Sequence, residues 1–79
     1  MKTFYILLSS ISDVKQFVNH ATMQSFDIDI ISGRYIIDAK SIMGIFSIDL
    51  SKPIRVDVHG TDKDGDDFYA LVKAYETKA

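Results

Sequence analysis

The order of apolar and polar residues along this chain predicts four β-strands and three helices. A strand is expected where apolar, β-branched or aromatic residues run together or alternate with polar ones. The segments with this pattern are residues 3–8, 26–30, 34–38 and 54–59. Helices are expected where apolar residues recur at intervals of three and four. They begin at Ser12, at Ser41 and after a turn over residues 60–65.

Residues that favour helix starts and turns set the predicted boundaries. Ser12 and Asp13 offer a capping hydroxyl and a first-turn carboxylate, so the first helix is expected to run from there to about Ser25. The pair Ser32-Gly33 signals a hairpin between two strands. The expected apolar faces of the two long helices are Val14, Phe17, Val18 and Ala21 in the first, and Phe68, Leu71, Val72 and Tyr75 in the last.

The order of these elements, βαββαβα, predicts an α+β fold. Four strands that alternate in polarity favour one antiparallel sheet, with the helices packed on a single face. The length of 79 residues leaves no room for a second domain, because single domains typically need about 100 residues. A single domain over residues 1–79 is therefore expected.

The composition narrows the classes of partner and environment. Nine basic and eleven acidic side chains give a net charge of −2, which argues against a nucleic-acid partner because phosphate binding relies on clustered Lys and Arg. The absence of cysteine excludes a disulfide-stapled miniprotein and a thiolate zinc site. No apolar stretch approaches the roughly 18 residues of a membrane-spanning helix. The run from Phe4 to Leu8 is also shorter than the roughly 7–15 apolar residues of a signal peptide. A cytoplasmic protein without a membrane partner is therefore expected.

One stretch, from Ala39 to Ser47, is specific enough to suggest a family. Its core, Lys40–Gly44, reads lysine-serine-isoleucine-methionine-glycine and is followed by an apolar pair and a serine. This motif resembles that of the HPr family, the small phosphocarrier proteins of the bacterial sugar phosphotransferase system. The similarity in element order extends over nearly the whole chain. The resemblance implies an HPr-like open-faced β-sandwich, which agrees with the fold expected from the pattern alone.

The second motif of the HPr family is missing from this sequence. In that family a histidine at the start of the first helix accepts the phosphoryl group, helped by a neighbouring arginine. With the first helices in register, Ser12 occupies the place of the histidine and Val14 that of the arginine. Asp13, beside that position, would repel an incoming phosphoryl group. The resemblance therefore implies a non-catalytic protein that has lost histidine phosphocarrier activity, similar to the catabolite-repression HPr paralogue.

Ser41 matches a serine that a dedicated kinase phosphorylates in HPr proteins of many Gram-positive bacteria. The resemblance thus implies a regulatory phosphorylation site at Ser41. A phosphate at the start of a helix adds about −1.5 to −2 charges at the favourable end of the helix dipole. The alternative is that Ser41 only caps the short helix.

The short helix after Ser41 carries apolar side chains that correspond to the family's docking patch for partner proteins. These residues are Ile42, Met43, Ile45 and Phe46. A short helix needs one face for the core, so its other apolar side chains can be exposed. The alternative is that all of them except Met43 point inward.

The remaining candidates for chemistry favour structural roles. His20 lies within the first helix, where no backbone N–H is free to hold a phosphate. His59 is expected on the outer face of the last strand with Asp57, and two ligands without a third make a poor metal site. The acidic residues 62–67 lack the ligand spacing of a calcium loop. No metal and no cofactor are expected.

These observations favour an HPr-like regulatory or adaptor protein, related to the phosphotransferase system, that docks partners through the Ser41 region. The resemblance implies an HPr kinase, a transcription regulator or a phosphotransferase-system component as the partner. One alternative is a working phosphocarrier that uses Ser12 or, after a shift of the helix, His20. Another is a small α/β module for ligand binding or oligomerisation. The expected state is a monomer, or a homodimer that exchanges the first strand.

Overall fold

Four strands form one antiparallel sheet in the computed structural model, which describes residues 1–78. The strands are β1 at Lys2–Ile6, β2 at Ile28–Ser32, β3 at Tyr35–Asp38 and β4 at Ile54–Val58. They lie in the order β1-β4-β2-β3. The helices are α1 at Ile11–Thr22, α2 at Ile42–Phe46 and α3 at Asp62–Val72, with a 3-10 turn, η1, at Lys73–Tyr75.

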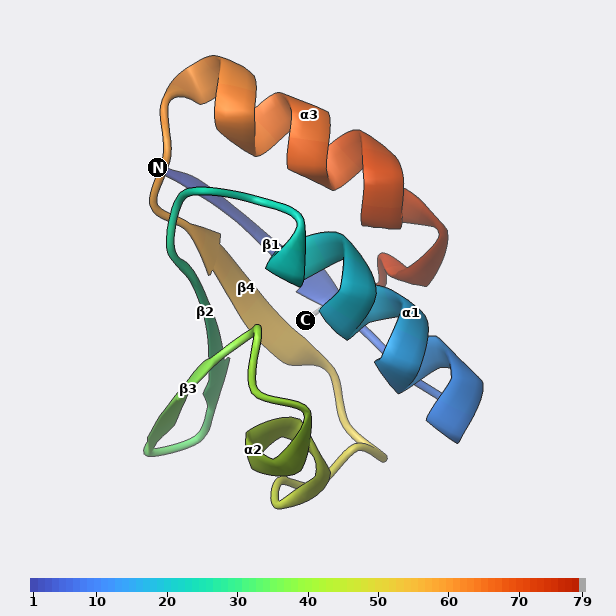
Figure 1. Ribbon diagram of the computed structural model, residues 1–79. Coiled ribbons are helices and arrows are strands. Elements are labelled where there is room, and N and C mark those ends of the chain that lie inside the picture. The colour runs from blue at the N-terminus through green and yellow to red at the C-terminus, as the bar shows by residue number, and fades with distance from the viewer. Residues whose placement is uncertain (79) are drawn as a thin grey trace.

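The element order and the layers confirm the predicted fold. The order is βαββαβα, and each of the three strand pairs is antiparallel. Helices α1 and α3 lie across one face of the sheet, and α2 lies beside the end of β3 (Figure 1). Within residues 1–78, no helix has both the length and the hydropathy needed to cross a bilayer.

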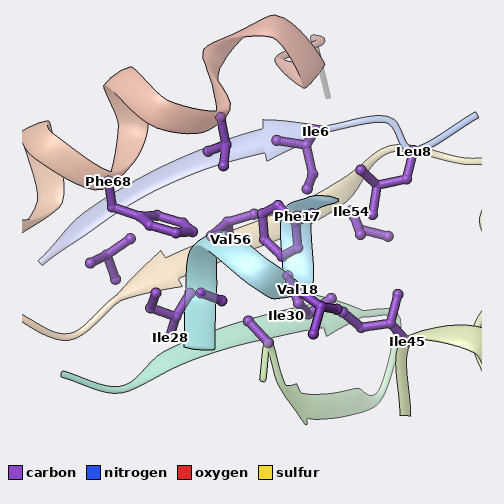
Figure 2. Close-up of a cluster of buried hydrophobic side chains, with 14 of the residues drawn as sticks. Ile6, Leu8, Phe17, Val18, Ile28, Ile30, Ile45, Ile54, Val56 and Phe68 are labelled. Atoms are coloured by element: carbon purple, nitrogen blue, oxygen red, sulfur yellow. The ribbon is translucent and has the colours of Figure 1, made fainter. Parts of the chain in front are cut away.

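The core fills the space between one face of the sheet and the helices (Figure 2). Alternate strand residues point into it, such as Ile28 and Ile30 of β2 and Val56 of β4. Phe17 of α1 and Phe68 of α3 meet edge to face, with their ring centroids 5.9 Å apart. The predicted stripe on α1 is buried at all four positions, Val14, Phe17, Val18 and Ala21.

Helix α1 begins earlier than the sequence pattern predicts. Its N-cap is Ser10, whose Oγ accepts a hydrogen bond from the backbone N–H of Asp13 at 3.1 Å. The prediction that Ser12 caps this helix is therefore wrong, because Ser12 is already its second residue. The helix also ends earlier, at Thr22.

Helix α3 begins inside the segment predicted to be a turn. The Oγ1 of Thr61 accepts a hydrogen bond from the N–H of Asp64 at 3.1 Å, and Oδ2 of Asp64 accepts one from the N–H of Thr61 at 3.0 Å. This reciprocal pair satisfies two backbone donors and starts the helix at Asp62. The predicted turn over residues 60–65 is therefore wrong from residue 62 onward.

Two further expectations differ from the structure. Leu71 does not belong to the buried face of α3 and is 47% exposed. Phe68 and Val72 lie one helical turn apart and already make the contact between this helix and the core. Strand β2 begins at Ile28 rather than at Phe26. Phe26 packs against the core from the connection that precedes the strand.

The C-terminal segment lies along the outer edge of β1. The backbone N–H of Leu7 donates to the carbonyl of Tyr75 at 2.8 Å, and the N–H of Thr77 donates to the carbonyl of Tyr5 at 2.9 Å. These bonds occupy backbone groups that an edge strand would otherwise expose. This edge of the sheet is therefore covered over part of its length.

Gly65 lets α3 pack directly on β1. A Cβ at this position would lie 2.5 Å from the Cβ of Lys2, which is too close for two carbon atoms. We expect Gly65→Ala to lower the free energy of unfolding by up to about 2 kcal/mol, because an overpacking cost of about 1–3 kcal/mol outweighs a gain of about 1 kcal/mol in helix propensity. Denaturant unfolding measures the change. The exposed Asp67→Ala is the control, with an expected change of about 0.5 kcal/mol at most. A stabilised Gly65→Ala variant would contradict the close packing.

Candidate functional site

An apolar hollow of about 660 Å³ lies where the start of α1 meets the end of α2. Its lining comes from the connection before α1, from one end of each helix and from the loop after α2: Leu7, Leu8, Ser9, Ser10, Ile11, Phe46, Leu50 and Ser51. Leu8 is buried, whereas Ile11 is 63% exposed and Phe46 is 40% exposed. A hollow of this volume with apolar walls has the size and character of a binding site.

The start of α1 is held by a small network of polar side chains. Besides the cap from Ser10, the carboxylate of Asp13 accepts hydrogen bonds from the backbone N–H of Ser9 at 3.3 Å and from its Oγ at 3.0 Å. The carboxylate is also favourably placed in the first turn, at the positive end of the helix dipole. These bonds fix the chain on both sides of Ile11, the first residue of the helix, at the border of the hollow.

Close contact with β3 fixes the position of α2. A Cβ on Gly44 would lie 2.6 Å from Cγ2 of Ile37 and 3.0 Å from Oγ of Ser41, so the approach of helix to strand leaves no room for a side chain there. Ile45 is fully buried and anchors the helix to the core. With Ile45 inside, Met43 is left 76% exposed.

Ser41 is the N-cap of α2. Its Oγ accepts a hydrogen bond from the N–H of Gly44 at 3.2 Å, and its own N–H donates to the carbonyl of Asp38 at 2.9 Å. The residue is half-buried. The neighbouring Lys40 extends toward the end of α1, where its Nζ donates to the carbonyl of Gln24 at 2.9 Å.

The four apolar residues predicted to dock partners divide into two pairs. Ile42 packs partly against the core and Ile45 lies within it, whereas Met43 and Phe46 are exposed. Neither version of the prediction describes this arrangement fully. Ile45 is inaccessible, and the alternative that leaves only Met43 outside overlooks Phe46.

The sequence pattern gave no sign of the hollow's other border. Ile11 lies three residues before Val14 and seven before Val18, so helical periodicity assigns it to the buried stripe. In the structure it is exposed because the first turn of α1 borders the hollow rather than the filled core. Leu7 and Leu50 also line the hollow from outside the strands and helices.

The other residues considered from the sequence lie elsewhere or have other partners. Ser12 is exposed, and its Oγ accepts a hydrogen bond from Nε2 of Gln16 at 3.4 Å. His20 is half-buried near the end of α1, and His59 lies 2.9 Å from Asp29, measured from Nε2 to Oδ2. None of these three lines the hollow.

Asp57 and His59 do not act together as a ligand pair. The carboxylate of Asp57 accepts hydrogen bonds from Oγ1 of Thr3 at 3.0 Å and from Nη2 of Arg55 at 3.2 Å. His59 is paired with Asp29 instead. Among residues 1–78, no three acidic, histidine or cysteine side chains lie together in a way that could hold a metal ion.

Asp49 orders the loop after α2, which contributes Leu50 and Ser51 to the lining of the hollow. The Oγ and backbone N–H of Ser51 donate to its Oδ1 at 2.5 and 2.9 Å. These two hydrogen bonds, first from the side chain and then from the backbone, hold the pKa of Asp49 below its ordinary value. The carboxylate therefore stays ionised and keeps Ser51 in place beside the hollow.

Two solved structures share this arrangement of strands and helices. HPr-C-His from Thermoanaerobacter tengcongensis matches 94% of this chain and 89% of its own, with a TM-score of 0.78 and 23% identity. The histidine-containing phosphocarrier protein of Mycoplasma matches 91% of this chain and 88% of its own, with a TM-score of 0.74 and 20% identity. The chain has an HPr-like fold. This confirms the fold that the motif Lys40–Gly44 implied.

The sequence itself has diverged widely. No protein-family model matches it, and no curated protein does. At 20–23% identity, the two HPr structures establish the architecture of the HPr-like chain and leave its activity to be argued from its own residues.

The cap on α2 can be tested with two substitutions at Ser41. We expect Ser41→Ala to lower the free energy of unfolding by about 1 kcal/mol, because the N–H of Gly44 loses its partner. Ser41→Asp should change it little, because aspartate caps a helix about as well as serine. Denaturant unfolding of both variants gives the comparison. Equal stability of Ser41→Ala and the unmodified chain would contradict a capping role.

Proposed function

We propose that this chain is an HPr-like regulatory or adaptor protein, related to the phosphotransferase system, that docks protein partners beside α2. The docking surface consists of Ile11, Phe46 and Leu50, which line the apolar hollow, and of Met43, which precedes Phe46 by three residues on α2. The observation that carries this proposal is that exposed Ile11 and Phe46 and half-buried Leu50 line one hollow on an HPr-like fold. Exposed Met43 lies one helical turn before Phe46 on α2. An HPr kinase, a transcription regulator or a phosphotransferase-system component is the partner that this surface would serve.

The chemistry of the docking surface suits a protein partner. Met43 has a flexible, polarisable side chain and Phe46 an aromatic ring, and both residue types are enriched in the centres of protein interfaces. Charged residues are depleted in the centres of protein interfaces. The lining of this hollow likewise has no charged residue and is apolar apart from serines. Apolar side chains of the partner would enter the hollow while Ile11 and Phe46 pack against them.

Loss of the histidine phosphocarrier activity is part of the proposal. The chain has two histidines, and neither lines the hollow. Asp13 places a carboxylate in the first turn of α1, where an incoming phosphoryl group would meet its negative charge. The polar groups at this helix start serve to cap the helix and to hold its carboxylate.

Ser41 is proposed as the regulatory phosphorylation site of the same surface. Helix α2 has five residues, so Ser41 and Phe46 lie at opposite ends of a helix roughly 8 Å long. This length is close to the Debye length of about 8 Å at physiological ionic strength. A phosphate of about −1.5 to −2 charges on Ser41 would therefore be felt by a partner docked at Phe46.

The phosphorylation is tested with a purified HPr kinase and ATP. Mass spectrometry should show one phosphate on Ser41 in the unmodified chain and in Ser47→Ala, and none in Ser41→Ala. Absence of phosphate at Ser41 in the unmodified chain would remove the regulatory part of the proposal. A parallel reaction with phosphoenolpyruvate and enzyme I should leave the chain unmodified. Acid-labile phosphate after that reaction would instead support a working phosphocarrier.

The docking surface is tested through the rate of the same kinase reaction. We expect Ile11→Ser and Phe46→Ser each to lower kcat/KM by about tenfold or more, because each removes an apolar contact at the interface. Met23→Ser is the matched control, since Met23 is 77% exposed at the far end of α1 and should leave the rate unchanged. Thermal unfolding verifies that each variant is folded. Equal rates for all three variants would contradict docking at this surface.

A further inference from the structure

The two edges of the sheet differ in what covers them. The outer edge of β1 carries the C-terminal segment, which donates and accepts backbone hydrogen bonds there. The outer edge of β3 has no strand beside it within residues 1–78, and Figure 1 shows β3 at the margin of the sheet. An uncovered edge strand presents unpaired backbone groups to any strand that fits it.

The register of β3 shows which of its backbone groups point outward. The N–H of Ala39 donates to the carbonyl of Ile28 at 2.9 Å, which continues the ladder between β2 and β3. Hydrogen-bonded and non-bonded pairs alternate along an antiparallel ladder, so Ile37 and Tyr35 bond to β2 and the backbone groups of Ile36 point away from it. The N–H of Asp38 also points outward, whereas its carbonyl accepts from Ser41.

The side chains along this edge are exposed and apolar. Ile36 is 72% exposed and Tyr35 is 68% exposed. Neither proline nor lysine, the residues that commonly block an edge strand, occurs within β3. Exposed Arg34 precedes the strand and exposed Asp38 ends it, so opposite charges flank Ile36 at equal spacing.

We propose that two copies of this chain pair through β3, antiparallel about a two-fold axis at Ile36. In this register Ile36 lies opposite Ile36 of the second copy, and their outward N–H and C=O groups exchange two hydrogen bonds. Arg34 of each copy lies opposite Asp38 of the other. The β3 edges of the two copies therefore match in three ways: backbone donors face acceptors, Ile36 packs on Ile36, and each arginine faces an aspartate.

Other registers lose this complementarity. A shift that keeps the outward backbone groups aligned sets either Arg34 or Asp38 opposite Ile36 of the second copy, and both ion pairs are lost. A register shifted by a single residue sets the outward N–H and C=O groups of one strand opposite residues whose backbone groups point inward, so the two hydrogen bonds at Ile36 cannot form. Pairing about a two-fold axis uses the β3 edge of both copies, so it closes a dimer rather than extending a filament. The other edge of the sheet, at β1, is covered over part of its length by the C-terminal segment.

The dimer is expected to be weak. Strand β3 has four residues, so the contact area falls below the ~1,200 Å² typical of stable protein interfaces. Dimer formation therefore depends on protein concentration, and we expect to detect it at high micromolar to millimolar concentrations. The β3 contact lies outside the docking surface, so the proposal stands or falls independently of the proposed function.

Sedimentation velocity of the full chain over that concentration range tests the pairing. The unmodified chain should show a rising fraction of dimer. Arg34→Asp and Asp38→Arg should each weaken dimerisation by about tenfold, because each sets like charges opposite one another twice. An equimolar mixture of these two variants should recover the dimer, because every charged position then faces its opposite.

Two further variants separate the β3 edge from other contacts and from loss of folding. Ile36→Pro removes an N–H that points outward and blocks pairing while the bonds to β2 remain, so it should be monomeric with a cooperative thermal transition. Ile11→Ser, at the docking surface, should dimerise like the unmodified chain. The proposal would be overturned if the unmodified chain is monomeric or if the mixture of charge variants stays monomeric. It would also be overturned if the dimer is lost in Ile11→Ser and kept in Ile36→Pro.

Discussion

Burial of one face of α1 against the sheet is the interaction on which the rest of this structure depends. Phe17 reaches from the helix into the core and meets Phe68 of α3, so a single side chain joins both long helices to the sheet. A domain of this size has a stability of only about 3–5 kcal/mol. Removing a buried phenylalanine costs about as much as that, roughly 3–5 kcal/mol. Loss of the Phe17 or Phe68 side chain would therefore be enough to unfold the domain.

The same packing exposes the apolar residues that we propose as a docking surface. The stripe on α1 is buried from Val14 onward, which leaves the first turn to border the hollow and exposes Ile11. At the other side, Gly44 and Ile45 draw α2 so close to β3 and the core that Met43 and Phe46 are left outside. Within the motif, Ser41 caps α2, Gly44 allows the close approach to β3 and Ile45 is buried in the core, whereas Met43 and Phe46 are exposed.

Much of the fold could be predicted from the sequence, because periodicity records which side chains the core needs. The four-stranded sheet, the element order and the stripe on α1 follow from that pattern. Helix starts were harder, since several residues near each start can cap. Ser10 rather than Ser12 caps α1, and the reciprocal bonds of Thr61 and Asp64 turn a predicted loop into helix.

The candidate site was predictable only in part. The motif drew attention to Ser41, Met43 and Phe46. Ile11 and Leu50 line the same hollow from segments far apart in the chain, and no local pattern signals that. Periodicity also misplaced Leu71, because spacing cannot show which of two adjacent apolar residues the core has room for. Pairing of the β3 edge depends on sheet order and register, which alternation within one strand does not reveal.

The central claim is that partners contact this chain at the apolar surface between α1 and α2. Methyl-labelled protein titrated with a purified HPr kinase, followed by NMR spectroscopy, tests it most directly. The account predicts chemical-shift changes concentrated at Ile11, Met43 and Leu50, with Ile31 on the opposite face of the sheet unchanged. Changes confined to that opposite face, or no change at saturating kinase, would contradict it.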